Sequence, residues 1–174
     1  MSDLRYPIGE FVFPGTVNPA ERSLCVDVLR QLPADLRAAL AGLAEAKEDA
    51  PYRAGGWTIR QVVHHIADSN MNAYIRMKLA ATAANPTITP YDEAAWAELK
   101  DGKTAPIALS LALLDALQAR WVMFLEGLPE EAWSRTFHHP EHGDLRIDVA
   151  LALYAWHSSH HVAHITAVRE REKF

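Results

Sequence analysis

The sequence predicts an all-α protein built as a four-helix bundle, and three observations support this fold class. Four long stretches carry apolar residues at helical spacing, alternation typical of strands is almost absent, and prolines and glycines separate the stretches. The chain has 174 residues, of which 49% are hydrophobic and 22% are charged, as in a globular domain with a substantial core. We therefore expect residues 1–174 to form a single domain.

The amino-terminal part predicts an extended arm followed by two helices. Prolines, glycines and aromatic residues dominate the first nineteen positions, which favours a short extended arm packed on the body. Leucines then recur at helical spacing from Leu29 to Leu43, and Pro33 indicates that a second helix opens there after a short first one. Residues 49–56 are expected to form a loop.

Two further helices and a long loop are expected in the centre of the chain. A helix over residues 58–84 is followed by a loop over 85–104, and Pro106 has the position of a first-turn proline in the next helix, which ends at Gly127. The aromatic residues Tyr91 and Trp96 allow two interpretations of the loop. It packs over the open end of the bundle or against a partner subunit and helps to shape a substrate pocket, or it is a tether whose tryptophan fills the core.

A turn-rich segment and the last helix complete the chain. Residues 137–147 read FHHPEHGDLRI, which predicts a small hairpin, and the last helix is expected over residues 148–171. The three histidines of the hairpin segment, His138, His139 and His142, have mixed polar neighbours and are expected on the surface.

Charge and targeting signals exclude several classes of partner. The net charge is −5 and the basic residues are scattered, which disfavours a nucleic-acid or an anionic-membrane surface. The first residues lack the basic start and apolar run of a signal peptide, and no run of eighteen apolar residues occurs. The single cysteine, Cys25, cannot form an internal disulfide. We expect a cytoplasmic protein without a membrane span.

Four of the nine histidines lie within YAWHSSHHVAHI in the last helix. At 100° per residue, His157 and His161 fall near the centre of the apolar face, and residues four apart stack one turn above the other, as in other metal-binding pairs. His160 and His164 have the same spacing, although the helical phase favours the first pair. A metal ion would satisfy several inward imidazoles together, whereas the alternative is a set of core histidines satisfied by hydrogen bonds.

A third ligand is available in the helix over residues 58–84. His65 shares a polar arc with Asp68, Asn72 and Arg76, and this arc either faces solvent or forms one wall of a polar pocket inside the bundle. Asp68 would then orient a ligand or accept a proton, unless it is a surface or capping residue.

Two segments together resemble the DinB superfamily, and specifically its YfiT-like branch: W-T-x-R-Q-V-V-H-H-I-A-D-S, which starts at Trp57, and W-H-S-S-H-H-V-A-H-I near the end. The resemblance covers almost the whole chain and implies a four-helix bundle that binds one divalent metal, zinc or nickel, through three histidines in a cytoplasmic homodimer. The family pattern places the ligands at His65, His157 and His161. One departure is Asn70, where close relatives have a histidine that is not a ligand.

Three functions are compatible with this resemblance. Three neutral imidazoles leave a divalent ion with open positions, as in catalytic sites. The function that we favour is a bacillithiol-type S-transferase, in which the metal activates a low-molecular-weight thiol for attack on an electrophile. Asp68 is then a catalytic candidate, while Asn72 and Arg76 would contact the thiol. The first alternative is a metal-dependent hydrolase that uses metal-bound water. The second is a non-catalytic metal-binding module of a stress response.

Overall fold

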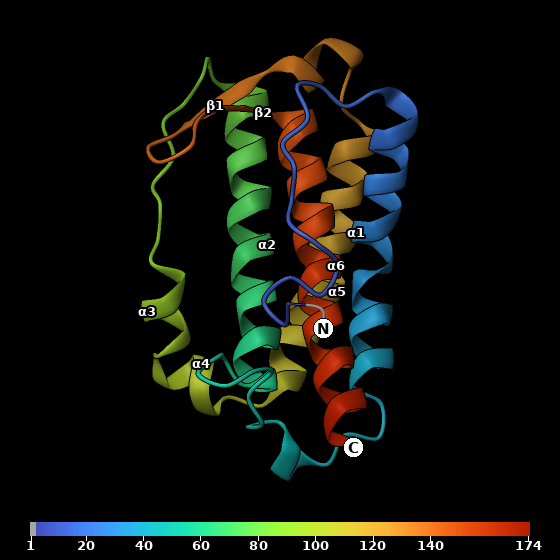
Figure 1. Cartoon of the computed structure of the whole chain (residues 1–174). Helices are drawn as coiled ribbons and strands as arrows, with labels where there is room; N and C mark the ends of the chain where they lie inside the picture. The colour runs from blue at the N-terminus through green and yellow to red at the C-terminus, as the bar shows by residue number, and fades with distance from the viewer. Residues whose placement is uncertain (1–2) are drawn as a thin grey trace.

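A computed structural model describes residues 3–174 and confirms the four-helix bundle (Figure 1). The four long helices are α1 (Pro19–Leu40), α2 (Ile59–Thr82), α5 (Ile107–Glu126) and α6 (Ile147–Glu172). Both α1 and α2 pack against α5 and α6. In Figure 1, α1 and α6 run in one direction while α2 and α5 run in the other. Helices α1 and α2 follow one another along the chain, and they lie diagonally across the bundle because both pack against the same two helices, α5 and α6.

A capping box determines where α2 begins. The Thr58 hydroxyl accepts a hydrogen bond from the backbone N–H of Gln61 at 3.1 Å, and the Gln61 side chain accepts from the Thr58 N–H at 2.9 Å. This reciprocal pair satisfies two of the N–H groups that a helix start leaves free. The following residues Ile59, Val62 and Ile66 are completely buried, so the rotation of α2 in the bundle is set by its apolar face.

The expected break at Pro33 is wrong, because α1 continues through this proline as one helix. Proline lacks the N–H that would bond to the preceding turn, and in a helix interior this normally causes a kink or a break. Here Leu29, Leu32 and Leu36 on either side of it are 0–2% exposed, so burial of this apolar face holds the helix together.

The loop expected over residues 85–104 contains two short helices, α3 (Glu93–Ala97) and α4 (Lys100–Thr104). The Asp92 carboxylate caps α3 by accepting from the Ala95 N–H at 2.9 Å, a local signal that explains why a helix forms there. Two short 3₁₀ helices, η1 (Glu45–Lys47) and η2 (Glu130–Ser134), complete the helical elements among the described residues.

The predicted hairpin is present as β1 (Thr136–His139) paired antiparallel with β2 (Gly143–Arg146). The chain before α3 runs along its edge: the His138 N–H donates to the Pro86 carbonyl at 2.9 Å, and the Ile88 N–H donates to the His138 carbonyl at 3.0 Å. The hairpin and this segment together cover one end of the α2–α6 pair (Figure 1).

The predicted amino-terminal arm is also present and runs along α6 (Figure 1). At one end the Val17 N–H donates to the buried Asp148 carboxylate at 3.4 Å, and in the middle the ring of Phe11 lies 5.7 Å from that of Trp156. At the other end the Arg5 carbonyl lies 3.1 Å from the Nε2 atom of His164. The arm therefore shields the face of α6 that the other helices leave free.

By length and composition alone, α5 is the one helix of the described chain that could cross a membrane, with a mean hydropathy of 1.5. The sequence predicts no membrane span, because it contains no run of eighteen apolar residues. A single helix of this kind is weak support for a membrane span, because the core helix of a bundle meets the same criterion. In this bundle α5 packs against α1 and α2, with Leu114 and Trp121 completely buried and Leu109 and Met123 exposed.

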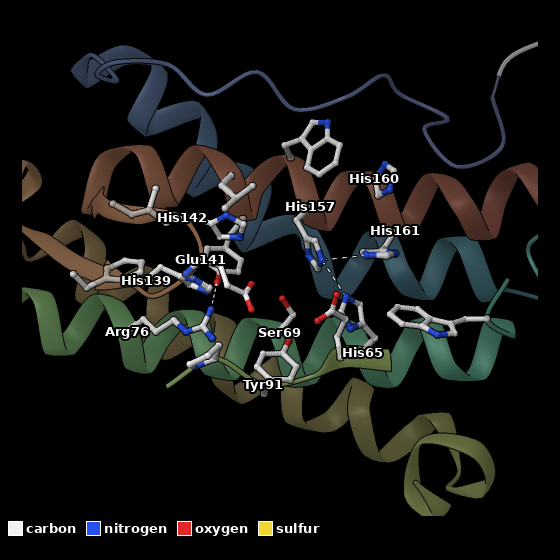
Figure 2. Close-up of a pocket in the computed structure, with 18 residues that line it drawn as sticks. His65, Ser69, Arg76, Tyr91, His139, Glu141, His142, His157, His160 and His161 are labelled. Atoms are coloured by element: carbon white, nitrogen blue, oxygen red, sulfur yellow. Dashed lines mark hydrogen bonds between the residues drawn. The ribbon is translucent and has the colours of Figure 1, made fainter. Parts of the chain in front are cut away.

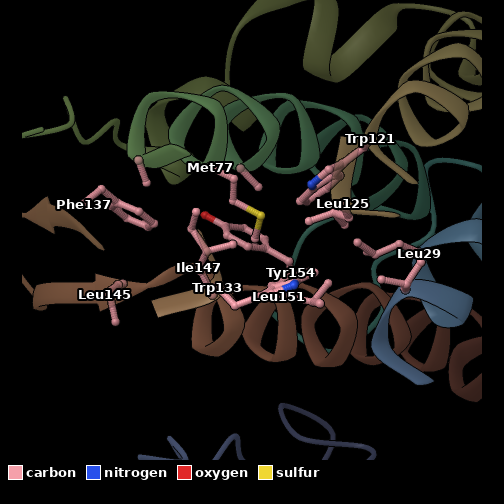
Figure 3. Close-up of a cluster of buried hydrophobic side chains, with 14 of the residues drawn as sticks. Leu29, Met77, Trp121, Leu125, Trp133, Phe137, Leu145, Ile147, Leu151 and Tyr154 are labelled. Carbon is pink, nitrogen blue, oxygen red and sulfur yellow. The ribbon is translucent and has the colours of Figure 1, made fainter. Parts of the chain in front are cut away.

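The core contains a polar link between α2 and α5. Most of the core is apolar, and Figure 3 shows its larger cluster around Met77, Trp121 and Leu151. Asn70 is nevertheless completely buried: its side-chain N–H₂ donates to the Ile66 carbonyl and its oxygen accepts from Gln118, both at 2.8 Å. Most buried polar groups in proteins have such partners.

Replacing Asn70 by alanine should lower the free energy of unfolding by about 1–3 kcal/mol, because the buried amide of Gln118 would lose its acceptor. Urea unfolding followed by circular dichroism measures this change. The exposed substitution Lys78→Ala on the same helix is the control and should change the stability by less than about 0.5 kcal/mol. An unchanged midpoint for Asn70→Ala would show that this pair does not hold α2 and α5 together.

Candidate metal centre

Three histidine side chains converge between α2 and α6 (Figure 2). His65 comes from α2, while His157 and His161 lie one turn apart on α6. The Nε2 atom of His157 is 3.1 Å from that of His65 and 3.1 Å from that of His161. One nitrogen of each ring lies within 4.8 Å of the others. The structure thus brings together the three residues that the sequence predicted as ligands, and the polar arc of α2 faces the bundle interior at His65.

These distances fit a shared cation. Around a tetrahedral zinc ion with Zn–N bonds of about 2.0–2.1 Å, neighbouring ligand nitrogens lie about 3.3 Å apart. The two separations of 3.1 Å are close to this value. Trp57 packs against the ring of His65 at 4.6 Å, which restricts the rotation of that ligand. The donor set of three imidazoles suits zinc or nickel.

The histidines are in the protonation state that a metal requires. Burial lowers the pKa of His65 to about 4, and burial together with the neighbouring histidines lowers the pKa of His157 and His161 well below the ordinary value. All three rings are therefore neutral at pH 7, so their lone pairs need no deprotonation before they bind a cation.

A chain of hydrogen bonds orients His161. The Nε2 atom of His164 lies 3.1 Å from the Arg5 carbonyl, which can only accept, so this nitrogen carries the proton. The Nδ1 atom of His164 is consequently an acceptor and lies 3.3 Å from the Nδ1 atom of His161, which must donate to it. The Nε2 atom of His161 is left with its lone pair directed at His157. The amino-terminal arm thereby sets the tautomer of a candidate ligand.

The alternative pair, His160 and His164, lacks a third donor, since no group of three candidate ligands in residues 3–174 contains either residue. His160 instead stacks on Trp156 with ring centroids 4.5 Å apart, and its Nδ1 atom is buried without a hydrogen-bond partner in the described chain. Of these two histidines, His164 is therefore the one that forms a hydrogen bond to a candidate ligand in the described structure.

The three histidines lie at one end of a pocket of about 390 Å³ that extends along α2 and α6 towards the hairpin (Figure 2). This volume is in the range of small-molecule sites. The segment before and at the start of α3 contributes Pro90, Tyr91 and Glu93 to the lining. The first interpretation of the loop, that it shapes the pocket, agrees with this placement, while Trp96 packs behind the ring of Tyr91 at 4.3 Å.

The residues of the predicted polar arc of α2 do not all face the pocket. Arg76 lines the pocket, but Asp68 and Asn72 do not. Asp68 lies on the flank of the helix, where burial and the nearby Asp101 raise its pKa, and the side chain of Asn72 turns back to donate to the Asp68 carbonyl at 2.9 Å. The roles predicted for Asp68 in catalysis and for Asn72 in cofactor binding therefore gain no support from their positions.

The opposite end of the pocket contains residues whose role the sequence did not indicate. His139 was expected on the surface but is 7% exposed, and it lines the pocket with Glu141 and His142. These three side chains form a second group with nitrogen and oxygen atoms within 4.8 Å of one another. The Nδ1 atom of His139 is already occupied by the Glu141 N–H at 3.2 Å. No spacing rule could have revealed this end, because the hairpin reaches the pocket only through tertiary packing.

Two phenols, the buried Tyr154 and the half-buried Tyr91, line the pocket. Burial raises the pKa of Tyr91 to about 12 and also raises the pKa of Tyr154, although the nearby Arg76 opposes the latter shift. Both hydroxyls therefore keep their protons at neutral pH and are available as hydrogen-bond donors in the pocket.

Comparison with known proteins identifies the family. Residues 29–165 match the DinB superfamily. A protein of Bacillus mycoides (strain KBAB4) that carries the name "Putative metal-dependent hydrolase" is 50% identical over 98% of both chains. The structure of YfiT from Bacillus subtilis, described as "a probable metal-dependent hydrolase with an unusual four-helix bundle topology", superposes with a TM-score of 0.95, with 46% identity over 98% of both chains. TT2238, a four-helix bundle protein, shares the fold at a TM-score of 0.57 and 23% identity, covering 81% of this chain and 94% of its own. The chain belongs to the DinB superfamily.

Proposed function

We propose that this protein is a divalent-metal-dependent hydrolase of small molecules and that His65, His157 and His161 bind the metal. The observation that carries the proposal is the convergence of three neutral imidazoles, with Nε2 separations of 3.1 Å, at one end of a pocket of about 390 Å³. When bound there, zinc or nickel supplies Lewis-acid chemistry that activates a small nucleophile. The names of the relatives from Bacillus support this reading.

Tyr154 is the side chain best placed to assist the reaction. It lines the pocket with its ring 6.3 Å from that of His157, and its hydroxyl oxygen accepts a hydrogen bond from Arg76 at 3.1 Å. Because that oxygen accepts from Arg76, the hydroxyl proton is free to point at a substrate. A donor fixed in this way would hold the oxygen of a carbonyl group and stabilise negative charge that develops on it.

S-transfer with a low-molecular-weight thiol, the function favoured from the sequence, becomes the second candidate because the relatives carry hydrolase names. Specific support for it is the length of the pocket, which extends from the three histidines to the hairpin and offers space for a thiol and an electrophile together. It also requires no separate group to protonate an alcohol or amine leaving group. Asp68, the catalytic candidate proposed from the sequence, lies outside the pocket. The substrate class, a cytoplasmic location and a homodimer are parts of this proposal that follow from the family resemblance.

Alanine substitution of His65, His157 or His161 should abolish stoichiometric metal binding, because two remaining imidazoles seldom hold zinc. Inductively coupled plasma mass spectrometry of protein purified without a nickel resin measures the metal content. His138→Ala is the matched control, since this exposed histidine pairs with Asp144 and does not line the pocket. Full metal content in the His157→Ala variant would contradict the proposed ligand set.

His164→Ala should weaken zinc binding by about 10- to 100-fold, the usual effect of removing the partner that orients a histidine ligand. Competition with a chromogenic chelator measures this affinity. His160→Ala is the comparison, because this ring has no hydrogen bond to the three candidate ligands in the described structure. Equal losses in the two variants would show that the Arg5–His164–His161 chain does not set the ligand.

Assays of the metal-loaded protein separate the candidate functions. Hydrolysis of p-nitrophenyl esters supports the hydrolase, whereas consumption of a small thiol with monochlorobimane as the electrophile, above the uncatalysed rate, supports the S-transferase. Tyr154→Phe should lower kcat by about 10- to 100-fold at unchanged metal content, because one hydrogen bond to the transition state is lost. Turnover in neither assay, over a broad panel of esters and thiols, would leave a metal-binding module without catalysis.

A further inference from the structure

Three arginines are buried among the described residues, and they have different partners. Arg22 is 6% exposed and contacts both oxygens of the Glu130 carboxylate, at 2.6 and 2.8 Å. Arg60 is 8% exposed and pairs with Glu48 at 2.9 Å and with Asp49 at 2.8 Å. Each of these two buried charges is compensated by a carboxylate, which is the usual condition for burying a charge.

Arg76 is the exception. It is also 8% exposed, but within residues 3–174 no carboxylate lies within 4.0 Å of its guanidinium. Its hydrogen bonds go to neutral acceptors, the Tyr154 hydroxyl at 3.1 Å and the Thr89 carbonyl at 3.4 Å, and it lies over the ring of Tyr91 at 5.7 Å. A buried positive charge without an opposite charge is unfavourable, so a free protein that retains one has a reason outside its own stability.

The position of Arg76 supplies that reason. The side chain lines the pocket that holds the three histidines, and Figure 2 shows it among Ser69, Tyr91 and His139. The pocket carboxylates, Glu93 and Glu141, belong to exposed positions of α3 and the hairpin turn, where water solvates them. The guanidinium and the two phenols of Tyr91 and Tyr154 thus present hydrogen-bond donors to the same part of the cavity.

We infer that Arg76 is the binding site for an oxyanion of the substrate, a carboxylate or a phosphate, with Tyr91 as a neighbouring donor. This inference deepens the proposed function, because it concerns the substrate of the same pocket. Arg76 follows His65 by eleven residues on α2, which is about three turns and places the two backbone positions about 16 Å apart. The guanidinium itself contacts the hydroxyl of Tyr154, whose ring lies 6.3 Å from that of His157, so the oxyanion binds beside Tyr154 on the hairpin side of the three histidines.

Binding of small anions tests the inference without any assumption about turnover. The probes are phenylacetate and phenyl phosphate, with the neutral phenylacetamide as the reference, and the fluorescence of Trp57 and Trp156 in the pocket lining reports binding. The wild-type protein should bind at least one anion 10-fold or more tightly than the amide, and the tighter of the two identifies the chemistry of the oxyanion. Arg76→Gln should weaken anion binding by about 10- to 100-fold and leave amide binding unchanged, as expected for a charge-assisted hydrogen bond.

Three further variants make the result specific. Arg76→Lys keeps the charge and should lose less affinity than Arg76→Gln, and it replaces that variant as the test if Arg76→Gln does not fold. Arg22→Gln is the matched control: it breaks a buried pair and should lower the melting temperature while anion binding stays at the wild-type level. His157→Ala removes a candidate metal ligand but keeps Arg76, so it should retain anion binding.

Two outcomes would overturn the inference. In the first, the wild-type protein binds neither anion more tightly than the amide. In the second, Arg76→Gln binds the anions as tightly as the wild type does. If His157→Ala has also lost anion binding, the anions bind at the metal. The proposed metal site then stands, while the role of Arg76 fails. Anion binding that depends on Arg76 in a protein without metal or turnover would support this inference and contradict the proposed function.

Discussion

The interface between α2 and α6 has to hold three imidazole rings at one level of a bundle whose interior is mostly apolar, and much of the structure follows from this requirement. Ile66 on α2 and Ile165 on α6, each next in sequence to a histidine, are completely buried, so apolar packing surrounds this level of the bundle outside the pocket. Burying polar rings in such surroundings is unfavourable unless their nitrogens find partners. The structure directs one nitrogen of each ring at a common point and provides His161 with an acceptor on its other side, while the Nδ1 atom of His157 has no hydrogen-bond partner in the described chain.

This requirement explains the amino-terminal arm. An extended segment contributes little to an apolar core, but here its Arg5 carbonyl fixes the proton of His164, and its aromatic residues cover Trp156 and His160. The arm thus determines the tautomers of His164 and His161 through one backbone oxygen, the Arg5 carbonyl. Backbone carbonyls are suited to this role because they accept hydrogen bonds and never donate them.

One wall of the pocket is built from long helices, and the other walls are built from connecting segments. Helices α2 and α6 position the three histidines, Arg76 and Tyr154, while the hairpin and the segment before α3 close the cavity with Tyr91 and His139. Functional specificity commonly resides in such connecting segments, because they can change without disturbing the packed helices. The uncompensated charge of Arg76 adds a constraint that the four-helix fold itself does not require, and it distinguishes the substrate end of the pocket from the metal end.

Local sequence accounts for the four long helical stretches, the hairpin, the arm and the inward direction of His157 and His161, since each depends on periodicity or turn chemistry within a short stretch. The other features depend on tertiary packing. Whether the arc of His65 faced water or the interior depended on which helix packed against it, and the continuity of α1 through Pro33 depended on burial of its leucines. Three further features also depend on contacts between segments that are distant in the chain. Asp68 lies outside the pocket, His139 lines it, and Arg76 has no carboxylate partner within residues 3–174. Local spacing sets where a side chain points on its own helix, but its neighbours and its electrostatic partners are set by the packing of the other elements.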